Sequence, residues 1–416
     1  MEKLLMIADD FTGALDTGVQ FAARGARTRI VTDPAYEFSQ TEGDAQVLVL
    51  DAETRHLTPE AAYQVVFRAV KNALKSGFDY IYKKTDSALR GNIGAELTAV
   101  MDAAESDRLA FIPALPRMNR VTRKGVHYID GVPVAESVFG QDPFEPVTAS
   151  SIAEIISAQS KVPVVLHELD AAEAMTRPGV HVYDAESEED LQRTGRALGR
   201  EGLRLSAGCA GFAAVLAELL ELNGTPPGRP ELVPALFVAC GSVNPVTLRQ
   251  MEEAEKAGFC HIHLTPVQKL EPAWLETEDC GAAINAWLES AGTKGRFILD
   301  VNDPAGSTAT ADYAKARGLT TEDLRLRISD QLGRLVRRLL DGGLNATLLC
   351  TGGDTLLALT RAVGVAELTP VCDLDAGAVL TDFVYQGKTC HIISKSGGFG
   401  EPDLFIRLAQ TINAGD

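Results

Sequence analysis

Short apolar runs rich in β-branched residues alternate with longer helical patterns along most of the chain. The first run is LLMIA at 4–8, and a helical pattern follows it from residue 13 to Gly25. Strand-like runs at 28–32 and 45–51 and a helical pattern at 59–77 repeat the alternation. Such repeats are typical of α/β domains, in which helices flank a mostly parallel sheet. We therefore expect an α/β protein built from such sheets.

The helical pattern at 59–77 also predicts a buried face, because apolar residues recur there at helical spacing and Gly77 can end the helix. A second local prediction concerns GVHYIDGVPV, where Asp130 and Gly131 lie between two β-prone runs and indicate a tight hairpin. The expected buried face of the helix consists of Val65, Ala69 and Ala73, joined by Phe67, Val70 and Leu74.

The length of 416 residues predicts two or three domains. The clearest break is NGTPPGRPELVP at 223–234, where Gly and Pro concentrate between a helical pattern and a new strand. We predict one domain at 1–224, a linker at 225–234 and a second domain at 235–416. Each domain is expected to hold a mostly parallel sheet, with the active site in the cleft between them.

Charge and composition exclude several classes of partner. A net charge of -18 disfavours nucleic acids and anionic membranes. The chain has no apolar run long enough to cross a bilayer, and its first residues lack the features of a secretory signal, so we expect a cytoplasmic protein. Seven cysteines, all between Cys209 and Cys390, show no CxxC spacing, which indicates buried apolar residues and not disulfides.

Three strands after residue 234 run into turns that contain glycine: GSVNP at 241–245, TGGDT at 351–355 and KSGGFGEPD at 395–403. In a parallel sheet these turns share the carboxyl edge, and we expect the helices after them to direct free N–H groups at bound phosphates. Any one such turn could simply join a strand to a helix, but three in one domain favour a polyphosphate site. The expected nucleotide-binding residues are Ser242, Gly352, Gly353, Asp354, Thr355, Gly397 and Gly398.

Common nucleotide motifs are absent from the sequence. The tripeptide at 387–389 resembles the end of a P-loop, but position 382 is Asp instead of Gly and a strand follows where a helix should begin, so we reject it. No Gly-x-Gly-x-x-Gly fingerprint follows the first strand of either block, so a dinucleotide-dependent dehydrogenase has little support. ATP is the expected nucleotide.

Two adjacent acids, Asp9 and Asp10, follow the first strand, at the edge where open α/β sheets bind ligands. Carboxylates at this place can orient hydroxyls, accept a proton or hold Mg²⁺. A single Asp would more often cap the helix that begins near Thr12, but two acids exceed what a cap needs. We therefore treat both as candidate site residues.

The segment KKTDSALRGN at 83–92 also follows a strand and combines cations, hydroxyls and a carboxylate. This set suits a hydroxylated anion, although a solvated charged loop would have the same composition. Arg55, in the loop after another strand, is a further candidate. The expected substrate-binding residues are Asp9, Arg55, Lys83, Lys84, Thr85, Asp86, Ser87 and Arg90.

Two histidines, His261 and His263, alternate on a short strand and can share a face. With no third ligand evident, a structural role is favoured over metal binding. Asp300, Asn302 and Asp303 end another strand and can bind Mg²⁺ or form an Asx turn. The sequence therefore assigns no metal ligands.

Several runs taken together resemble a known family: IADDFTGALDTGVQ, KKTDSALRGN, PALPRMNRVTRKGVHYIDGVPV, TGGDT and SGGFGEPD. They are similar to the four-carbon acid-sugar kinases. The resemblance implies an N-terminal substrate domain, a C-terminal nucleotide domain, and phosphorylation of the terminal (4-) hydroxyl of a tetronate by ATP with Mg²⁺. DTGVQ after DDFTGAL is more similar to the threonate and erythronate kinases, so D-threonate is the expected substrate, with D-erythronate and 3-oxo-tetronate as alternatives.

The resemblance also implies roles for single residues. It places Asp9, Arg55 and 84–87 at the substrate, and Ser242, 352–355 and Gly398 at the nucleotide. The catalytic base stays open among Asp9, Asp10 and Asp86, because a base must reach the attacking hydroxyl and the last of these acids lies among cations.

Two other classes of function are considered beside the kinase. One is a sensor that binds an acid sugar without turnover, which ATP binding would argue against, and the other is an oxidoreductase acting on the same acid. The expected partners are a small four-carbon acid sugar and ATP, with no nucleic acid and no membrane. A homodimer is allowed for.

Overall fold

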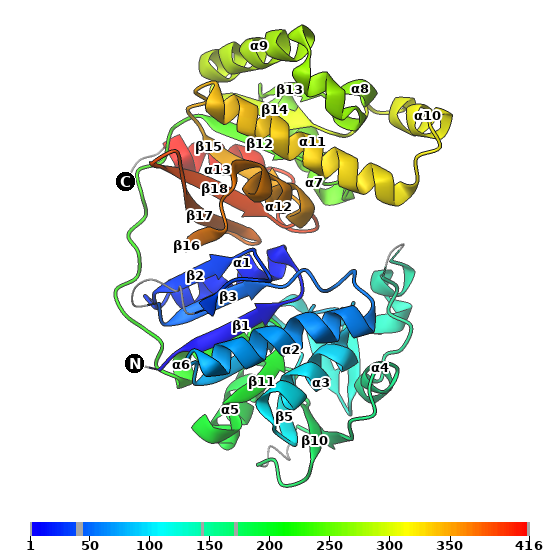
Figure 1. The fold of residues 1–416 in the computed structure, drawn as a ribbon, viewed down its shortest axis with the longest axis vertical. Coiled ribbons are helices and arrows are strands. Elements are labelled where there is room, and N and C mark those ends of the chain that lie inside the picture. Colours follow the sequence, from blue (N-terminus) through cyan, green and yellow to red (C-terminus); the bar gives the residue numbers. More distant parts are fainter. Residues whose placement is uncertain (1, 39–44, 143–144, 170–173, 414–416) are drawn as a thin grey trace. The chain divides into compact units, whose positions relative to one another are not determined.

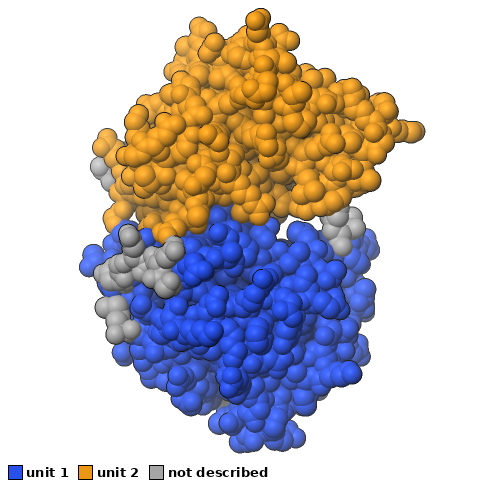
Figure 2. Space-filling model, in the orientation of Figure 1, with its two compact units in different colours: residues 1–227 blue, residues 228–416 orange. Residues whose placement is uncertain are grey.

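The computed structural model of the chain describes residues 2–38, 45–142, 145–169 and 174–413. The chain divides into two compact units, Met1–Pro227 and Gly228–Asp416, which Figure 2 shows in different colours. This division falls inside the predicted linker, while the domain bounds at 224 and 235 stay a prediction. Among the described helices, none is both long enough and apolar enough to span a membrane.

The first unit is an α/β structure whose large sheet is parallel throughout, in the order β2-β3-β1-β4-β11-β5-β10-β9 (Figure 1). Its helices form two groups: α2 packs on α3 and α3 on α4, while α6 packs on both α1 and α5. The strands are β1 (Leu4–Ala8), β2 (Thr28–Val31), β3 (Val47–Asp51), β4 (Tyr80–Lys84), β5 (Arg108–Ile112), β9 (Val164–His167), β10 (Gly179–Tyr183) and β11 (Leu205–Gly208). The helices are α1 (Phe11–Ala22), α2 (Pro59–Lys75), α3 (Ile93–Ala104), α4 (Ile152–Ser157), α5 (Glu188–Gly202) and α6 (Ala210–Leu219).

Helix α2 shows how the sequence sets a buried face. The hydroxyl of Thr58 accepts a hydrogen bond from the Ala61 N–H at 3.3 Å, which caps the helix where proline stands first. The prediction of a buried Leu74 is wrong, because this residue is 37% exposed. Successive residues of a helix point about 100° apart, so Leu74 points away from the direction of the buried Ala73. The buried residues are Ala62, Val66, Ala69, Val70 and Ala73, whereas Val65 and Phe67 are only partly buried.

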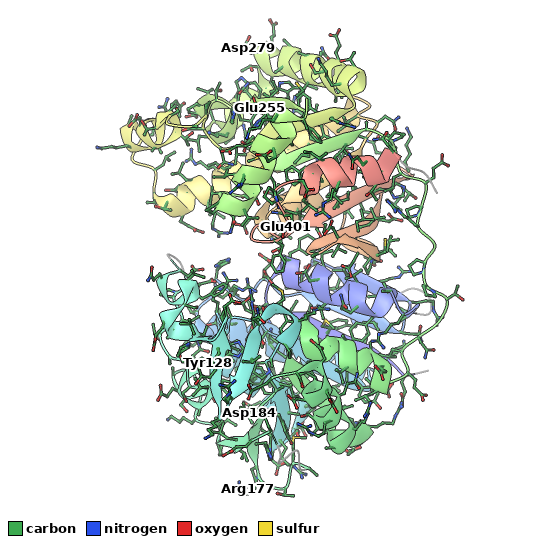
Figure 3. The ribbon with its side chains drawn as sticks, turned by 180° about the vertical axis from the view of Figure 1, so that it is seen from behind. Tyr128, Arg177, Asp184, Glu255, Asp279 and Glu401 are labelled. Atoms are coloured by element: carbon green, nitrogen blue, oxygen red, sulfur yellow. The ribbon has the colours of Figure 1, made fainter. Side chains whose placement is uncertain are left out.

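A small antiparallel sheet, β6-β7-β8, is inserted after β5. Strands β7 (Val126–Ile129) and β8 (Val132–Pro133) pair across Asp130 and Gly131, whose φ angles are both positive, so the predicted hairpin is confirmed. The preceding turn, between β6 (Arg120–Arg123) and β7, is held by Asp184, which is labelled in Figure 3. The Asp184 carboxylate accepts a hydrogen bond from the Gly125 N–H at 3.0 Å.

One side chain ties this small sheet to the segment that follows β4. His127 is buried, its Nε2 lies 2.9 Å from the Ser87 carbonyl oxygen, and its Nδ1 lies 3.2 Å from the Thr122 hydroxyl. Burial lowers the pKa of His127 to about 4, although the contact with the Ser87 carbonyl acts in the other direction. The imidazole is therefore neutral at pH 7.

The second unit is also α/β, and its sheet is mixed, in the order β13-β14-β12-β15-β18-β17-β16. Five strands are parallel, and β17 and β16 continue the sheet antiparallel. The strands are β12 (Leu236–Cys240), β13 (Cys260–His263), β14 (Arg296–Asp300), β15 (Thr347–Thr351), β16 (Glu367–Asp375), β17 (Ala378–Tyr385) and β18 (Lys388–Lys395). The helices are α7 (Pro245–Lys256), α8 (Pro266–Leu270), α9 (Glu278–Lys294), α10 (Ala309–Ala316), α11 (Thr321–Asp341), α12 (Gly353–Val363) and α13 (Leu404–Asn413).

The antiparallel part of this sheet explains the tripeptide that resembles a P-loop. Gln386 and Gly387 form the tight turn between β17 and β18, both with positive φ, and the chain continues as a strand. The tripeptide therefore opens no helix, and its rejection as a phosphate loop is confirmed.

The buried state of His127 predicts a pH dependence of stability. Its pKa is lower in the folded chain than the usual 6.5, so the unfolded chain binds more protons between about pH 4 and 6.5, and the free energy of unfolding falls as pH falls through this window, by about 3 kcal/mol in total. His127→Gln should reduce the difference in unfolding free energy between about pH 7 and about pH 4.5. Urea unfolding followed by circular dichroism measures this difference, with His391→Gln in the second unit as the control. An undiminished pH dependence in His127→Gln would contradict the assignment.

Candidate functional site

The polar residues of the first unit gather at the carboxyl edge of its parallel sheet. Ala8, the last residue of β1, is in register with Asp51 at the end of β3 and with Lys84 at the end of β4. Asp9 follows β1 directly, and Asp10 caps α1 by accepting from the Gly13 N–H at 2.9 Å. The three strand ends therefore bring their polar side chains to one place.

Arg55 links the acids at this edge. Its Nε donates to Asp9 Oδ2 at 2.8 Å, and its Nη2 lies 2.8 Å from Asp10 Oδ1 and 3.8 Å from Asp86 Oδ1. The Arg55 side chain is only 9% exposed, so it is no ordinary surface arginine. One guanidinium thus contacts all three acids that the sequence proposes as catalytic bases.

Asp86 is further held by a second arginine. Arg90 donates to both of its oxygens, with Nε at 2.7 Å and Nη2 at 3.2 Å, and also contacts Asp142 at 3.2 Å. Burial would raise the pKa of Asp86, but Arg90 and Arg55 outweigh it and hold this pKa well below its usual range. Asp86 is therefore ionised, and both of its oxygens are engaged.

Asp9 differs from Asp86 in having one oxygen to offer. Asp9 Oδ1 is buried and has no hydrogen-bond partner among the described residues. Burial acts to raise the pKa of Asp9, yet the charges of Arg55, Lys84 and Lys83 lower it on balance. A buried, ionised oxygen without a donor is costly to leave as it is, so it suits a hydroxyl of a bound ligand.

The adjacent lysines at the end of β4 have different surroundings. Lys83 is fully buried, and its ammonium lies 3.1 Å from the Glu96 carboxylate and donates to the Lys84 carbonyl oxygen at 2.8 Å. The Lys84 ammonium instead lies over Gly13, where an added Cβ would be 2.5 Å from Nζ. Among the described residues, none forms a hydrogen bond or ion pair with this ammonium, although Lys84 is only 5% exposed. A buried cation in this state suits an anionic ligand.

Thr85 and Ser87, two hydroxyl residues of the 83–92 segment, differ in whether their hydroxyl has a protein partner. The Thr85 hydroxyl is buried and has no partner among the described residues. The Ser87 hydroxyl accepts from Arg120, a residue that sequence reasoning missed. Arg120 and Arg90 both lie over the Phe139 ring, each at 5.2 Å from its centroid. Thr85, like Asp9 and Lys84, thus offers a group to a ligand, whereas Ser87 positions Arg120.

Sequence reasoning also missed Asp51 at the end of β3. Burial raises the pKa of its carboxyl well above the usual range, and the nearby acids Glu53 and Asp10 add to this effect. Its Oδ2 is buried without a partner among the described residues. The sequence contained a signal for this residue: Asp51 is an acid at the end of a predicted strand, and Asp9 follows the end of another strand in the same way.

In the second unit, the three glycine turns begin at the same level of the sheet. Cys240 of β12 is in register with Thr351 of β15, and Thr351 with Lys395 of β18. The turns contact one another: the Ser242 N–H donates to the Thr351 hydroxyl at 3.4 Å, and a Cβ on Gly397 would lie 2.9 Å from Ser242 Oγ. The predicted convergence of the three turns is therefore present.

The helices after these turns differ from the prediction in one respect. The N-terminus of α7 is capped by Asn244, which accepts from the Val246 N–H at 2.9 Å. Helix α12 starts after Gly352, which has a φ of 92° and gives no side-chain cap, so its first N–H groups can meet a ligand. The third helix, α13, begins only at Leu404, so the expectation of a helix directly after each turn is wrong for the third. Pro402 and the residues before it form an irregular segment instead.

Two charged groups near the turns have partners within this unit. The Lys395 ammonium, which the sequence reasoning missed, donates to the Thr247 hydroxyl at 2.8 Å and to the Gly397 carbonyl oxygen at 2.9 Å, and burial lowers its pKa to about 8. Asp354 pairs with Arg325 at 2.8 Å. The sequence signal for Lys395 was its place at the end of a strand, directly before a glycine turn.

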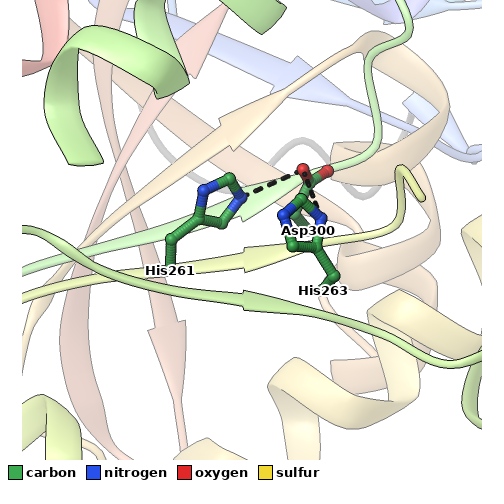
Figure 4. Close-up of side chains that lie close together, drawn as sticks. All are labelled: His261, His263 and Asp300. Carbon is green, nitrogen blue, oxygen red and sulfur yellow. Dashed lines mark hydrogen bonds and ion pairs between the residues drawn. The ribbon is translucent and has the colours of Figure 1, made fainter. Parts of the chain in front are cut away.

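The histidines of β13 have the third group that the sequence did not reveal. Asp300 Oδ2 lies 3.1 Å from His261 Nε2 and 3.4 Å from His263 Nδ1 (Figure 4). Asp300 also forms the Asx turn, since its Oδ1 accepts from the Asn302 N–H at 2.9 Å. Asp303 pairs with Lys269 at 2.7 Å.

Comparison with known proteins agrees with this division of the polar groups. Residues 4–216 match the family model of a sugar-binding N-terminal domain, and residues 237–405 match that of a nucleotide-binding C-terminal domain. The chain thus combines a sugar-binding domain with a nucleotide-binding domain, the two binding functions that a carbohydrate kinase needs.

Curated relatives match over almost the whole chain. A D-threonate kinase of Salmonella typhimurium is 30% identical over 96% of this chain and 95% of its own length. A D-threonate kinase of Bordetella bronchiseptica is 32% identical (98% and 96%), and a D-erythronate kinase of Heliobacterium modesticaldum is 28% identical (97% and 95%). Relatives named 3-oxo-tetronate kinase match at 26 to 28% identity. The chain belongs to the four-carbon acid-sugar kinase family, as the sequence resemblance predicts.

A solved structure supports the fold independently. A crystallised protein of Salmonella typhimurium LT2 superposes with a TM-score of 0.82 at 22% identity, covering 98% of this chain and 99% of that one. At this identity the likeness concerns the fold alone.

The contact between Gly13 and Lys84 yields a prediction. In Gly13→Ala the new Cβ would lie 2.5 Å from Lys84 Nζ and 2.6 Å from Asp10 Oδ1, so both the ammonium and the carboxylate that caps α1 must move. We expect kcat/KM for the acid sugar to fall at least about 10-fold, with only a small change in melting temperature, because the preference of a helix for alanine over glycine, up to about 1 kcal/mol, offsets the disturbed cap.

The matched control is Gly281→Ala in α9, where nothing lies within 4 Å of the added Cβ. Steady-state kinetics and thermal unfolding of both variants check the prediction. Wild-type kcat/KM in Gly13→Ala would show that the position of the Lys84 ammonium does not matter for turnover.

Proposed function

We propose that this chain transfers the γ-phosphoryl group of ATP, supplied with Mg²⁺, to the terminal (4-) hydroxyl of a tetronate, with D-threonate as the expected substrate. One observation carries the proposal: the buried Lys84 ammonium has no partner among the described residues and accompanies an equally unpartnered Asp9 oxygen. The pair offers a cation to an anionic group and an acceptor to a hydroxyl. A sugar acid carries both groups.

The three candidate bases then take different roles. Asp9 accepts the hydrogen bond of a substrate hydroxyl, because its Oδ1 is buried and receives no hydrogen bond from the described residues. Asp10 and Asp86 hold Arg55, and Asp86 is also bound on both oxygens by Arg90. In phosphoryl transfer through a loose transition state, an acid that orients the attacking oxygen is of more use than a strong base. The lowered pKa of Asp9 therefore fits this role.

The anionic end of the substrate is assigned to the cations of the same edge. Lys84 contacts either the substrate carboxylate or the phosphoryl group in transfer, and Thr85 donates its free hydroxyl to the polyol. Lys83 is bound to Glu96, so we assign it to positioning of the segment, together with Ser87 through Arg120.

The nucleotide is assigned to the glycine turns of the second unit. Ser242, Thr355, Gly397 and Gly398 lie where the turns meet, and the N-terminus of α12 offers N–H groups of Gly353 and its neighbours to the phosphates. Asp354 is paired with Arg325, so we assign it to the shape of the turn. Mg²⁺ enters as part of the substrate MgATP, bound mainly by phosphate oxygens and water.

Phosphoryl transfer requires donor and acceptor to meet in line, so the proposal includes an active site between the two domains that closes on its substrates. Membership of a kinase family removes support from the sensor and from the oxidoreductase. D-Erythronate and 3-oxo-tetronate stay alternative substrates, since the relatives carry all three names. The homodimer stays a prediction.

A coupled assay of ADP release against D-threonate, D-erythronate and 3-oxo-tetronate tests the proposed function. We expect turnover of at least one, with D-threonate giving the highest kcat/KM. No stimulation of ADP release by any of the three acids would overturn the proposal.

The role of Asp9 is tested by a pair of neighbouring variants. Asp9→Asn should lower kcat by about 10²- to 10⁴-fold, because the hydroxyl loses its charged acceptor. Asp10→Asn should have a much smaller effect, because asparagine caps α1 as aspartate does. Equal losses in the two variants would contradict the division of roles.

A further inference from the structure

A cluster outside the proposed phosphate site combines two imidazoles and a carboxylate. His261 and His263 lie two residues apart on β13 and therefore share one face of the sheet. Asp300 ends the neighbouring parallel strand β14, in register with His263. The side chains of Asp300 and His261 are 1% and 7% exposed, and that of His263 is 31% exposed. The cluster is thus buried on one side and open on the other.

The separations between the ligand atoms match those around a small cation. One ring nitrogen of His261, one of His263 and one Asp300 oxygen all lie within 4.8 Å of one another. Asp300 Oδ2 is 3.1 Å from the first nitrogen and 3.4 Å from the second (Figure 4). Bonds of about 2.0 Å in tetrahedral geometry separate neighbouring ligand atoms by about 3.3 Å. One cation can therefore bind both histidines and Asp300 after small movements.

Two of the three groups are also oriented from behind, as metal ligands usually are. The other ring nitrogen of His261, Nδ1, lies 3.4 Å from a Glu255 carboxylate oxygen. The other oxygen of Asp300, Oδ1, accepts from the Asn302 backbone N–H at 2.9 Å and from its side-chain Nδ2 at 2.7 Å. These contacts leave His261 Nε2 and Asp300 Oδ2 aimed at the shared position.

We propose that His261, His263 and Asp300 bind a divalent transition-metal cation of the Zn²⁺ class. Imidazole nitrogens favour such a cation over Mg²⁺ or Ca²⁺, which prefer oxygen ligands, so this site is separate from the ion that accompanies ATP. His263 Nδ1 lies 2.9 Å from the Asn302 carbonyl oxygen, and when the cation binds, the proton of that contact is replaced by one on Nε2, so that the imidazole stays neutral. Three protein ligands leave a further position for water.

The site is connected to the first glycine turn. Asn302, which orients Asp300, also donates through Nδ2 to the Ser242 carbonyl oxygen at 3.0 Å. A cation that fixes Asp300 therefore also fixes this asparagine and the turn at 241–245. The expected role of the bound cation is to stabilise the nucleotide-binding unit, and we expect it to make no contact with the reacting atoms.

Calorimetric titration of the chelator-treated full chain with Zn²⁺, without nucleotide, tests the proposal. We expect one Zn²⁺ per chain, a rise in melting temperature on binding, and visible ligand-field absorption when Co²⁺ replaces Zn²⁺. Asp300→Asn and His263→Gln should each weaken binding by more than about 100-fold, since even the loss of an orienting contact costs about 10- to 100-fold.

The matched control is His391→Gln, because His391 pairs with Asp382 at 2.7 Å in the same unit, and the described part of the chain places no third ligand beside them. This variant should bind Zn²⁺ as the wild type does. Absence of Zn²⁺ binding by the wild type, or equal affinity in all three variants, would overturn the proposal. Should Asp300→Asn fail to fold, His263→Gln on the more exposed residue and the Co²⁺ spectrum of the wild type decide alone. None of these readouts depends on kinase activity.

Discussion

Both units depend on one constraint, the register of parallel strands, which brings the carboxyl ends of non-consecutive strands to the same level. In the first unit this register joins Ala8 to Asp51 and to Lys84, and in the second it joins Cys240 to Thr351 and Thr351 to Lys395. Residues far apart in the sequence therefore meet at one edge without any long loop to place them. The same register places Asp300 beside His263.

Charge pairing at the first edge then decides which groups stay free for a ligand. Arg55 contacts three acids, Arg90 holds Asp86, and Lys83 is bound to Glu96. These pairs keep buried charges compensated, which a low-dielectric interior requires. Among the described residues, the groups that these pairs leave without a partner include the Lys84 ammonium and one oxygen of the ionised Asp9. In the proposed function, these two groups are the ones that would select an acid that also carries hydroxyls.

The sequence predicted the α/β class, the β7–β8 hairpin and the convergence of the glycine turns, because periodicity and turn chemistry act locally. The family was predicted from the resemblance of several sequence runs. It could not separate Lys83 from Lys84, since neighbours in a strand differ only in the face to which they point. Asp300 as the partner of His261 depends on pairing between strands about forty residues apart, which no local pattern encodes. Leu74 was wrongly predicted to be buried, because the apolar residues of this helix fit more than one possible buried face, and these faces differ by one position along the chain.

The central claim is that Lys84, and not its neighbour, is the cation kept for the substrate. Calorimetric binding of the preferred tetronate and thermal unfolding of Lys84→Met and Lys83→Met test it directly. We predict that Lys84→Met weakens binding about 10- to 100-fold with only a small loss of stability, because the ammonium forms no hydrogen bond or ion pair with the described residues and acts on Asp9 and Asp86 only through its charge. Lys83→Met should instead destabilise the chain by about 3–5 kcal/mol, because it leaves Glu96 buried without its cation. Wild-type affinity in Lys84→Met would contradict the account.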